Sequence, residues 1–134
     1  MSDLSRLIVG LKGRAALVVG AEHTAARVGS GGVASLATPV MVTLMEAAAV
    51  DAIAGVLPED RQSVGVRLLV EHHAATPVGM RVEAEAELVA VDGRTLTFRV
   101  TARDAVEPVG DGTHVRAVIE TARFDQRLQS KAAG

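Results

Sequence analysis

Residues 38–57 read TPVMVTLMEAAAVDAIAGVL, and this stretch decides the fold. Thr38 before Pro39 predicts a helix start, because a threonine hydroxyl at the N-cap accepts a hydrogen bond from a free backbone N–H and proline at the first helical position loses none. The helix is predicted to stop between Gly55 and Pro58. Apolar residues occupy almost every face, so the helix should be enclosed by other elements rather than lie on a surface.

The chain after this helix alternates between apolar and polar residues, which predicts strands. They are expected at residues 63–72, 81–91, 95–103 and 114–124. In the second of them, the apolar residues from Val82 to Leu88 alternate with glutamates, which is typical of a strand with one buried and one solvated face. Asp92-Gly93 predicts a tight hairpin, and the proline and glycines of residues 107–112 predict a looser turn.

A further strand is expected before the helix, within residues 14–28, and a glycine-rich loop at residues 29–32 links the two. One buried helix and about five antiparallel strands predict an α+β fold in which the sheet curls around the helix, the hotdog layout. Residues 1–134 then form one domain. Such a small sheet leaves edges that need cover, which favours a homodimer.

The composition excludes several classes of protein. The 14 basic and 16 acidic residues give a formal net charge of -2 with no basic run, which argues against a nucleic-acid partner. Without cysteine, the chain has no disulfide, thiolate metal site or catalytic thiol. Thr43, Glu46 and Asp51 interrupt the longest apolar stretch, which falls short of the ~20 apolar residues of a membrane span. The beginning of the sequence lacks a signal-peptide pattern, so a soluble, cytoplasmic protein is expected.

Glu46 is the leading candidate for acid–base chemistry. It is the only acidic residue between Met41 and Val50, in the middle of the apolar helix. Removal from water makes a carboxylate a stronger base, so Glu46 could attack a carbonyl or activate water. The alternative is that Glu46 and Thr43 share a solvated stripe of the helix.

Thr38 and the histidine pair are the other candidates. An N-cap threonine stabilises a helix by ~1 kcal/mol, which would explain Thr38 by itself, but free N–H groups at a helix start can also hold an oxyanion. His72 and His73 are neighbours in a strand and therefore point to opposite faces, which argues against a shared metal. One of them should face the helix and could exchange protons with Glu46; the alternative is a purely structural histidine.

Three segments together resemble the hotdog thioesterases, and most closely the fluoroacetyl-CoA thioesterase type: TPVMVTLMEAA, SVGVRLLVEHHAATPVG and GTHVRAVIE. The similarity extends from about residue 18 to residue 124. It implies hydrolysis of an acyl-CoA without a cofactor or metal. It also implies that Thr38, Glu46 and His72 are catalytic and that Gly65 and Arg116 help to bind the substrate. The resemblance assigns no role to His73.

The spacing of Thr38 and Glu46 adds an inference of its own. Eight residues of regular helix rise ~12 Å, which is too far for a direct hydrogen bond between these two side chains. A site that uses both is easier to build across two chains, with the helix start of one protomer facing the glutamate of the other. Whether such dimers pair into tetramers stays open.

Two other functions and the substrate remain open at this point. A hotdog enoyl-thioester hydratase would need an Asp and His pair on the helix side, and a non-catalytic acyl-CoA binding module would bind without turnover. In the fluoroacetyl-CoA group, aromatic side chains before the catalytic threonine form a lid, whereas residues 29–34 contain none. The sequence therefore predicts little selection for fluoroacetyl-CoA and a pocket open to a longer or bulkier acyl group, carried by CoA or by an acyl carrier protein.

Overall fold

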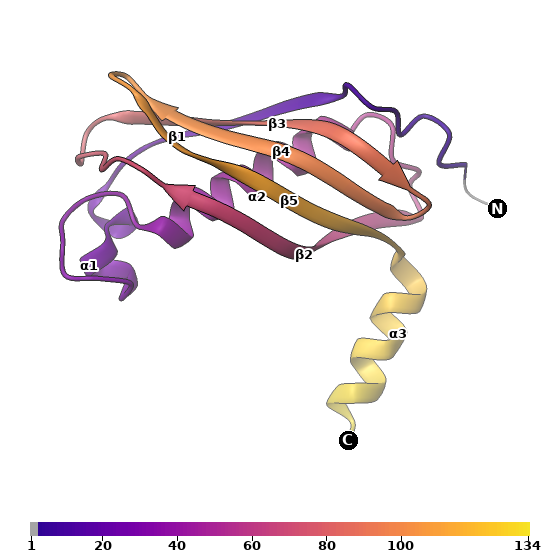
Figure 1. The fold of residues 1–134 in the computed structure, drawn as a ribbon. Helices are drawn as coiled ribbons and strands as arrows, with labels where there is room; N and C mark the ends of the chain where they lie inside the picture. The colour runs from indigo at the N-terminus through magenta and orange to yellow at the C-terminus, as the bar shows by residue number, and fades with distance from the viewer. Residues whose placement is uncertain (1–2) are drawn as a thin grey trace.

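The computed structural model describes residues 3–134, in which a curled five-stranded sheet holds one long helix on its concave side (Figure 1). The elements in chain order are β1 (Lys12–Val18), the 3-10 turn η1 (Ala21–His23), α1 (Ala25–Val28), α2 (Thr38–Ile53), β2 (Arg61–His72), β3 (Arg81–Asp92), β4 (Thr95–Asp104), β5 (Pro108–Glu120) and α3 (Thr121–Ala132). The strand order is β1-β3-β4-β5-β2, and every neighbouring pair is antiparallel. The predicted α+β fold is confirmed.

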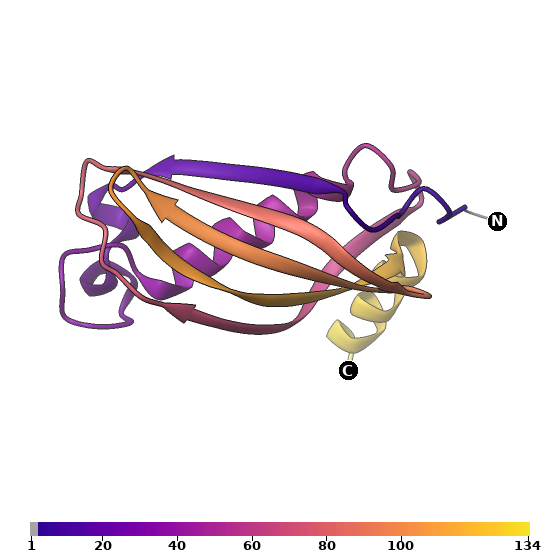
Figure 2. The same ribbon diagram turned by 45° about the horizontal axis from the view of Figure 1, so that its top comes forward.

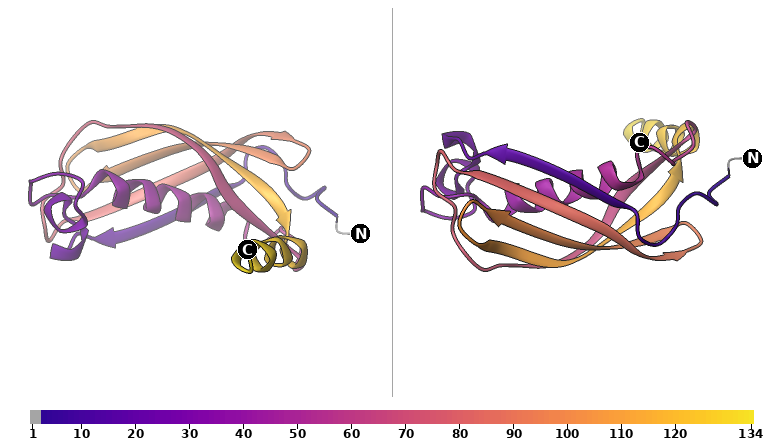
Figure 3. Two further views of the ribbon diagram at one scale, coloured as in Figure 1. Left: turned by 90° about the horizontal axis from the view of Figure 1, so that it is seen from below. Right: turned by 90° about the horizontal axis from the view of Figure 1, so that it is seen from above.

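Helix α2 lies along the sheet (Figures 2 and 3), and its buried side is apolar. Its buried residues recur at helical spacing: Met41, Leu44, Met45, Ala48, Ala49, Ala52 and Ile53. The small alanines let the helix approach β1 so closely that a Cβ at Gly13 would overlap with the backbone of Ala48 and Ala52. The opposite side, with Thr43, Ala47 and Val50, is exposed. The prediction that other elements enclose almost every face of this helix was therefore wrong for a single chain.

The alternation predicted for residues 81–91 is confirmed in β3. Its four inward residues from Val82 to Leu88 are fully buried, and the glutamates between them lie on the other face of the sheet. The neighbouring strand β4 contributes a matching row of buried residues: Leu96, Phe98, Val100 and Ala102. These two rows and the inner side of α2 form most of the core.

The predicted starts of the first and the last strand were wrong. The first strand, expected within residues 14–28, spans Lys12–Val18 and so begins before that range; the later part of the range is not strand, since Thr24 caps α1 there through a hydrogen bond from the Arg27 backbone N–H. The last strand begins at Pro108, not at residue 114. Asp104 makes this possible, since one carboxylate oxygen accepts the backbone N–H groups of Val106 and Glu107 and so closes a shorter turn.

Helix α3 was not predicted, and residues 121–124 belong to it rather than to the last strand. It extends from the end of β5 away from the sheet, and none of its residues is buried (Figures 1 and 3). Its sequence is rich in charged and polar residues, so no core pattern marks it. In the described chain, no helix combines the length and apolar character needed to span a membrane.

Candidate active site

Thr38 and His72 meet at the start of α2. The Thr38 hydroxyl oxygen lies 2.7 Å from His72 Nδ1, a distance typical of a hydroxyl and the base that activates it. The prediction that Thr38 is the N-cap was wrong: Ala37 occupies that position, and Thr38 is the first helical residue. Backbone hydrogen bonds fix the entry to the helix instead, from Ala37 N–H to the His23 carbonyl and from Leu36 N–H to the Thr76 carbonyl. The Thr38 hydroxyl is thereby left for the imidazole.

The environment of His72 favours a neutral ring. Burial lowers the pKa of His72, so the ring is neutral near neutral pH, and in the tautomer with an unprotonated Nδ1 it accepts the Thr38 hydroxyl hydrogen. A hydrogen bond with the Ala74 backbone acts in the opposite direction, but burial has the larger effect. As predicted from the alternation, the neighbouring His73 points to the other face, where its Nε2 lies 3.1 Å from the Asp111 carboxylate.

A cavity of about 290 Å³ opens beside the Thr38–His72 pair. Its walls come from three segments near the ends of the sheet, and they comprise Ala25, Ser30, Gly31, Val33, Ser35, Leu36, Thr38, His72, His73, Ala74 and Ala75. The glycine-rich loop therefore does line the space next to the candidate site. None of these wall residues is aromatic apart from the two histidines.

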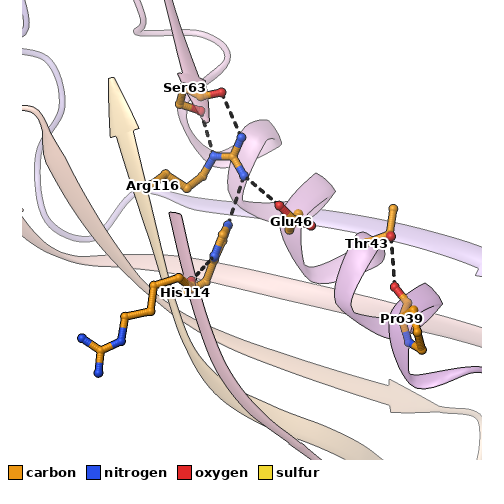
Figure 4. A network of polar contacts seen from close by, with 7 residues as sticks. Pro39, Thr43, Glu46, Ser63, His114 and Arg116 are labelled. Carbon is orange, nitrogen blue, oxygen red and sulfur yellow. Dashed lines mark hydrogen bonds and ion pairs between the residues drawn. The ribbon is translucent and has the colours of Figure 1, made fainter. Parts of the chain in front are cut away.

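Glu46 belongs to a second cluster, about two turns further along α2 (Figure 4). One carboxylate oxygen lies 3.5 Å from Arg116 Nη1, while the side chain of Glu46 remains 36% exposed and that of Arg116 only 7%. The guanidinium is held from behind by Ser63: Nε donates to the Ser63 hydroxyl at 2.8 Å and Nη2 to the Ser63 carbonyl at 3.0 Å. A carboxylate is thus fixed on one side and open on the other.

Gly65 leaves the space that this carboxylate fills. A Cβ at Gly65 would lie 2.6 Å from Glu46 Oε2 and 3.4 Å from Arg116 Nη1. Only a residue without a side chain lets α2 present its carboxylate so close to β2. The structure thus brings Gly65, Arg116 and Glu46 together.

A β-bulge puts Gly65 and His72 on the same face of β2. Gly65 pairs with Arg116, but Arg67 pairs with Val115, so Val66 is an extra residue in the ladder. Strict alternation would turn an odd-numbered and an even-numbered residue to opposite faces. The bulge reverses the alternation, and both Gly65 and His72 face α2.

Within one chain, the predicted catalytic residues fall into two groups. Thr38 contacts His72, whereas Glu46 pairs with Arg116, and no hydrogen bond or ion pair among the described residues joins Glu46 to His72. The expected proton exchange between these two side chains is therefore absent in the single chain. Helix α2 runs without interruption from Thr38 past Glu46, so the ~12 Å separation holds.

Sequence reasoning missed His114, which is fully buried beside Arg116. Its Nε2 atom lies 3.0 Å from Arg116 Nη1, and its Nδ1 atom lies 2.9 Å from the Arg67 carbonyl. A signal was present, because the spacing of His114, Arg116 and Val118 puts all three on one face of a strand. In the described chain, no group of three histidine, aspartate or glutamate side chains could hold a metal ion.

Comparison with known proteins identifies the family. A family model described as fluoroacetyl-CoA-specific thioesterase (FlK) matches residues 19–122. The fluoroacetyl-CoA thioesterase of Streptantibioticus cattleyicolor is 46% identical over 95 residues, which are 71% of this chain and 68% of that protein. A crystal structure of the fluoroacetyl-CoA thioesterase FlK has a TM-score of 0.85 at 38% identity, over 92% of this chain and 96% of the other.

More distant structures agree on the architecture. A hot-dog-like protein from Thermanaerovibrio acidaminovorans has a TM-score of 0.87 at 26% identity, over 99% of both chains. A thioesterase superfamily member from Thermus thermophilus has a TM-score of 0.87 at 25% identity, over 97% of this chain and 98% of the other. The predicted resemblance is confirmed, and the chain belongs to the fluoroacetyl-CoA-specific thioesterase family of hotdog thioester hydrolases.

Proposed function

We propose that this chain hydrolyses the thioester of a small or medium acyl-CoA, with Glu46 as the group that attacks the carbonyl or activates water. The observation that carries the proposal is the Glu46 carboxylate, which is held by Arg116 in a mostly apolar helix yet remains partly open. A fixed and accessible carboxylate is what either role requires. Membership of a thioester hydrolase family supports the same reaction.

The reaction can be written for both roles of Glu46. As a base, the carboxylate takes a proton from water while the water oxygen bonds to the carbonyl carbon; the C–S bond then breaks, and the sulfur of CoA receives a proton. As a nucleophile, the carboxylate bonds to the carbonyl carbon and releases the thiol, and water then opens the resulting anhydride. In both cases Thr38 lies near the carbonyl oxygen, and His72 is the proton partner.

We place this chemistry at an interface between two copies of the chain. Strand β2 is an edge of the sheet, and its side chains Val66 and Leu69 are 57% and 69% exposed. An unpaired apolar edge is the feature that a second copy would cover. The same strand carries Gly65 and His72, so pairing there would set the Thr38–His72 pair of one protomer toward the Glu46–Arg116 pair of its partner.

The charged outer face of the sheet argues against a tetramer in which two dimers pack through that face. It is covered by ion pairs at the surface, between Arg14 and Glu85, Arg81 and Glu83, and Arg99 and Glu87. Stacking a second dimer there would remove these charges from water, at a cost that their mutual attraction does not reliably offset. A hydrophobic face would be expected if two dimers packed back to back.

The walls of the cavity beside Thr38 and His72 limit how strongly the site can select between acyl groups. Its loop wall consists of small side chains around Gly31, with the mostly exposed Val33 as the largest. Such small side chains cannot form a fixed apolar wall against one fluorine atom, and a single apolar contact discriminates by only ~1 to 3 kcal/mol. We therefore expect hydrolysis of fluoroacetyl-CoA and acetyl-CoA to differ by less than the ~200-fold that such contacts allow.

A thiol-release assay with acetyl-, fluoroacetyl-, butyryl- and phenylacetyl-CoA tests the proposal. Wild-type protein should release CoA from at least one of them, and Glu46→Gln should lose most of this turnover because the amide keeps the shape and loses the base. Asp51→Asn is the matched control, since Asp51 lies on the same helix outside the cluster. A folded Glu46→Gln protein with near wild-type turnover would remove Glu46 from the reaction.

A further inference from the structure

His114 connects the backbone of β2 to the arginine that holds Glu46. The ring is fully buried on the inner face of β5, and both of its nitrogens have partners. We infer that His114 is a positioning residue: locked in one neutral tautomer, it orients Arg116 and through it the Glu46 carboxylate. This inference rests on the proposed function of Glu46, but the geometry behind it can be tested separately.

The two partners of His114 determine its tautomer. The Arg67 carbonyl can only accept a hydrogen bond, so His114 Nδ1 must carry the proton. The Arg116 guanidinium can only donate, so His114 Nε2 must be unprotonated. One neutral form satisfies both contacts at once. A doubly protonated ring would turn an N–H toward the guanidinium and lose this contact.

The surroundings of His114 also favour the neutral form of its ring. Burial lowers the pKa of His114, and the positive charge of Arg116 lowers it further, against the opposing effects of the Arg67 carbonyl and the Glu46 carboxylate. The charged groups that face the ring are Arg116 from its own strand and Glu46 from α2; β4 contributes the uncharged Phe98, whose ring centroid lies 6.3 Å away. The ring is therefore neutral at neutral pH.

The arginine is held through all three of its nitrogen atoms. Nε and Nη2 contact Ser63, and Nη1 lies between His114 and Glu46 (Figure 4). Among these partners, the His114 ring is anchored to the backbone at the β-bulge, through the Arg67 carbonyl. Loss of its acceptor would leave Nη1 with the 3.5 Å contact to Glu46 alone and free the carboxylate to shift.

Two conservative variants separate the two ends of the ring. His114→Gln offers a carbonyl oxygen at about the distance of Nε2 and so keeps an acceptor for Arg116. His114→Asn offers an N–H at about the position of Nδ1 and keeps the donor to Arg67 but not the acceptor. We expect His114→Asn to lower kcat by about 100-fold, as a misplacement of ~1 Å does, with KM little changed. His114→Gln should lie much closer to wild type.

A purely structural role would not give this order. The unfolding midpoint of each variant is measured alongside, and equal kcat losses in the Asn and Gln variants, or losses that follow stability alone, would overturn the positioning role.

A second readout does not depend on turnover. Long-range ¹H–¹⁵N NMR spectra of the wild-type protein should show His114 as the neutral Nδ1–H tautomer at neutral pH, and an Nε2–H tautomer or a charged ring would overturn the inference. If Glu46→Gln keeps full turnover while the NMR result and the Asn–Gln order hold, the proposed function of Glu46 fails and His114 still orients Arg116.

Discussion

A methyl group at Gly65 should lower turnover by about 100-fold without unfolding the protein. In Gly65→Ala the new Cβ would lie 2.6 Å from Glu46 Oε2 and 3.2 Å from His114 Cε1. The buried imidazole cannot move easily, whereas the end of the Glu46 side chain is flexible and 36% exposed. The carboxylate must therefore withdraw by roughly 1 Å to reach ordinary van der Waals distance.

This displacement gives the expected magnitude. A misplacement of ~1 Å at a reacting group costs about 100-fold in rate, or about 2.7 kcal/mol of transition-state stabilisation. Stability should change little, because Gly65 does not have a positive φ and the atom that must move is the far end of a side chain. The variant should therefore unfold at nearly the wild-type denaturant concentration.

The assay is thiol release under saturating acyl-CoA, paired with urea unfolding of the same samples. Gly55→Ala is the control, since no atom lies within 4 Å of a Cβ at that position. It should match wild type in both measurements. A folded Gly65→Ala protein with unchanged kcat would refute the reasoning, because the carboxylate would then tolerate a shift that the proposed chemistry forbids.

Three further predictions concern stability. Gly13→Ala should destabilise the fold by ~1 to 3 kcal/mol or more in urea unfolding, because its Cβ would meet the backbone of Ala52; wild-type stability would contradict the close packing of α2 on β1. Thr76→Val should cost ~1 to 3 kcal/mol by removing the buried 2.9 Å hydrogen bond to Asp104, and an unchanged midpoint would argue against that bond. Burial lowers the pKa of His72 and of His114, so the unfolded chain takes up protons first, and stability, complete above pH 6.5, should fall as the pH drops below that value; a flat profile would contradict this.

The sequence predicted the elements whose signals are local. The alternation from Val82 to Leu88 and the dipeptide Asp92-Gly93 identified β3 and the hairpin, because burial of one face requires a period of two. The same rule correctly separated the directions of His72 and His73. Helix α3 was not predicted because it buries none of its residues and its sequence therefore carries no core pattern.

The site depended on features that only the paired strands define. The bulge at Val66 leaves no mark in the sequence, yet without it His72 and Gly65 would face opposite sides. The cap position of Thr38 was mistaken because the backbone of Ala37 is held by a distant segment, which local propensity cannot reveal. His114 lay in the expected last strand but was its first residue, where alternation gives least guidance.

The shared site is the central claim, and subunit mixing tests it most directly. Thr38→Ala and Glu46→Gln chains, each measured alone first, are co-refolded in equal amounts. Random pairing makes half of the dimers mixed, and each mixed dimer would hold one intact site and one doubly altered site, so about one quarter of wild-type activity should appear. As the matched control, wild type mixed with the double variant should also retain about one quarter, because every site of its mixed dimers carries one defect. Activity no higher than that of the separate variants in the first mixture, together with about one half in the second, would contradict the shared site.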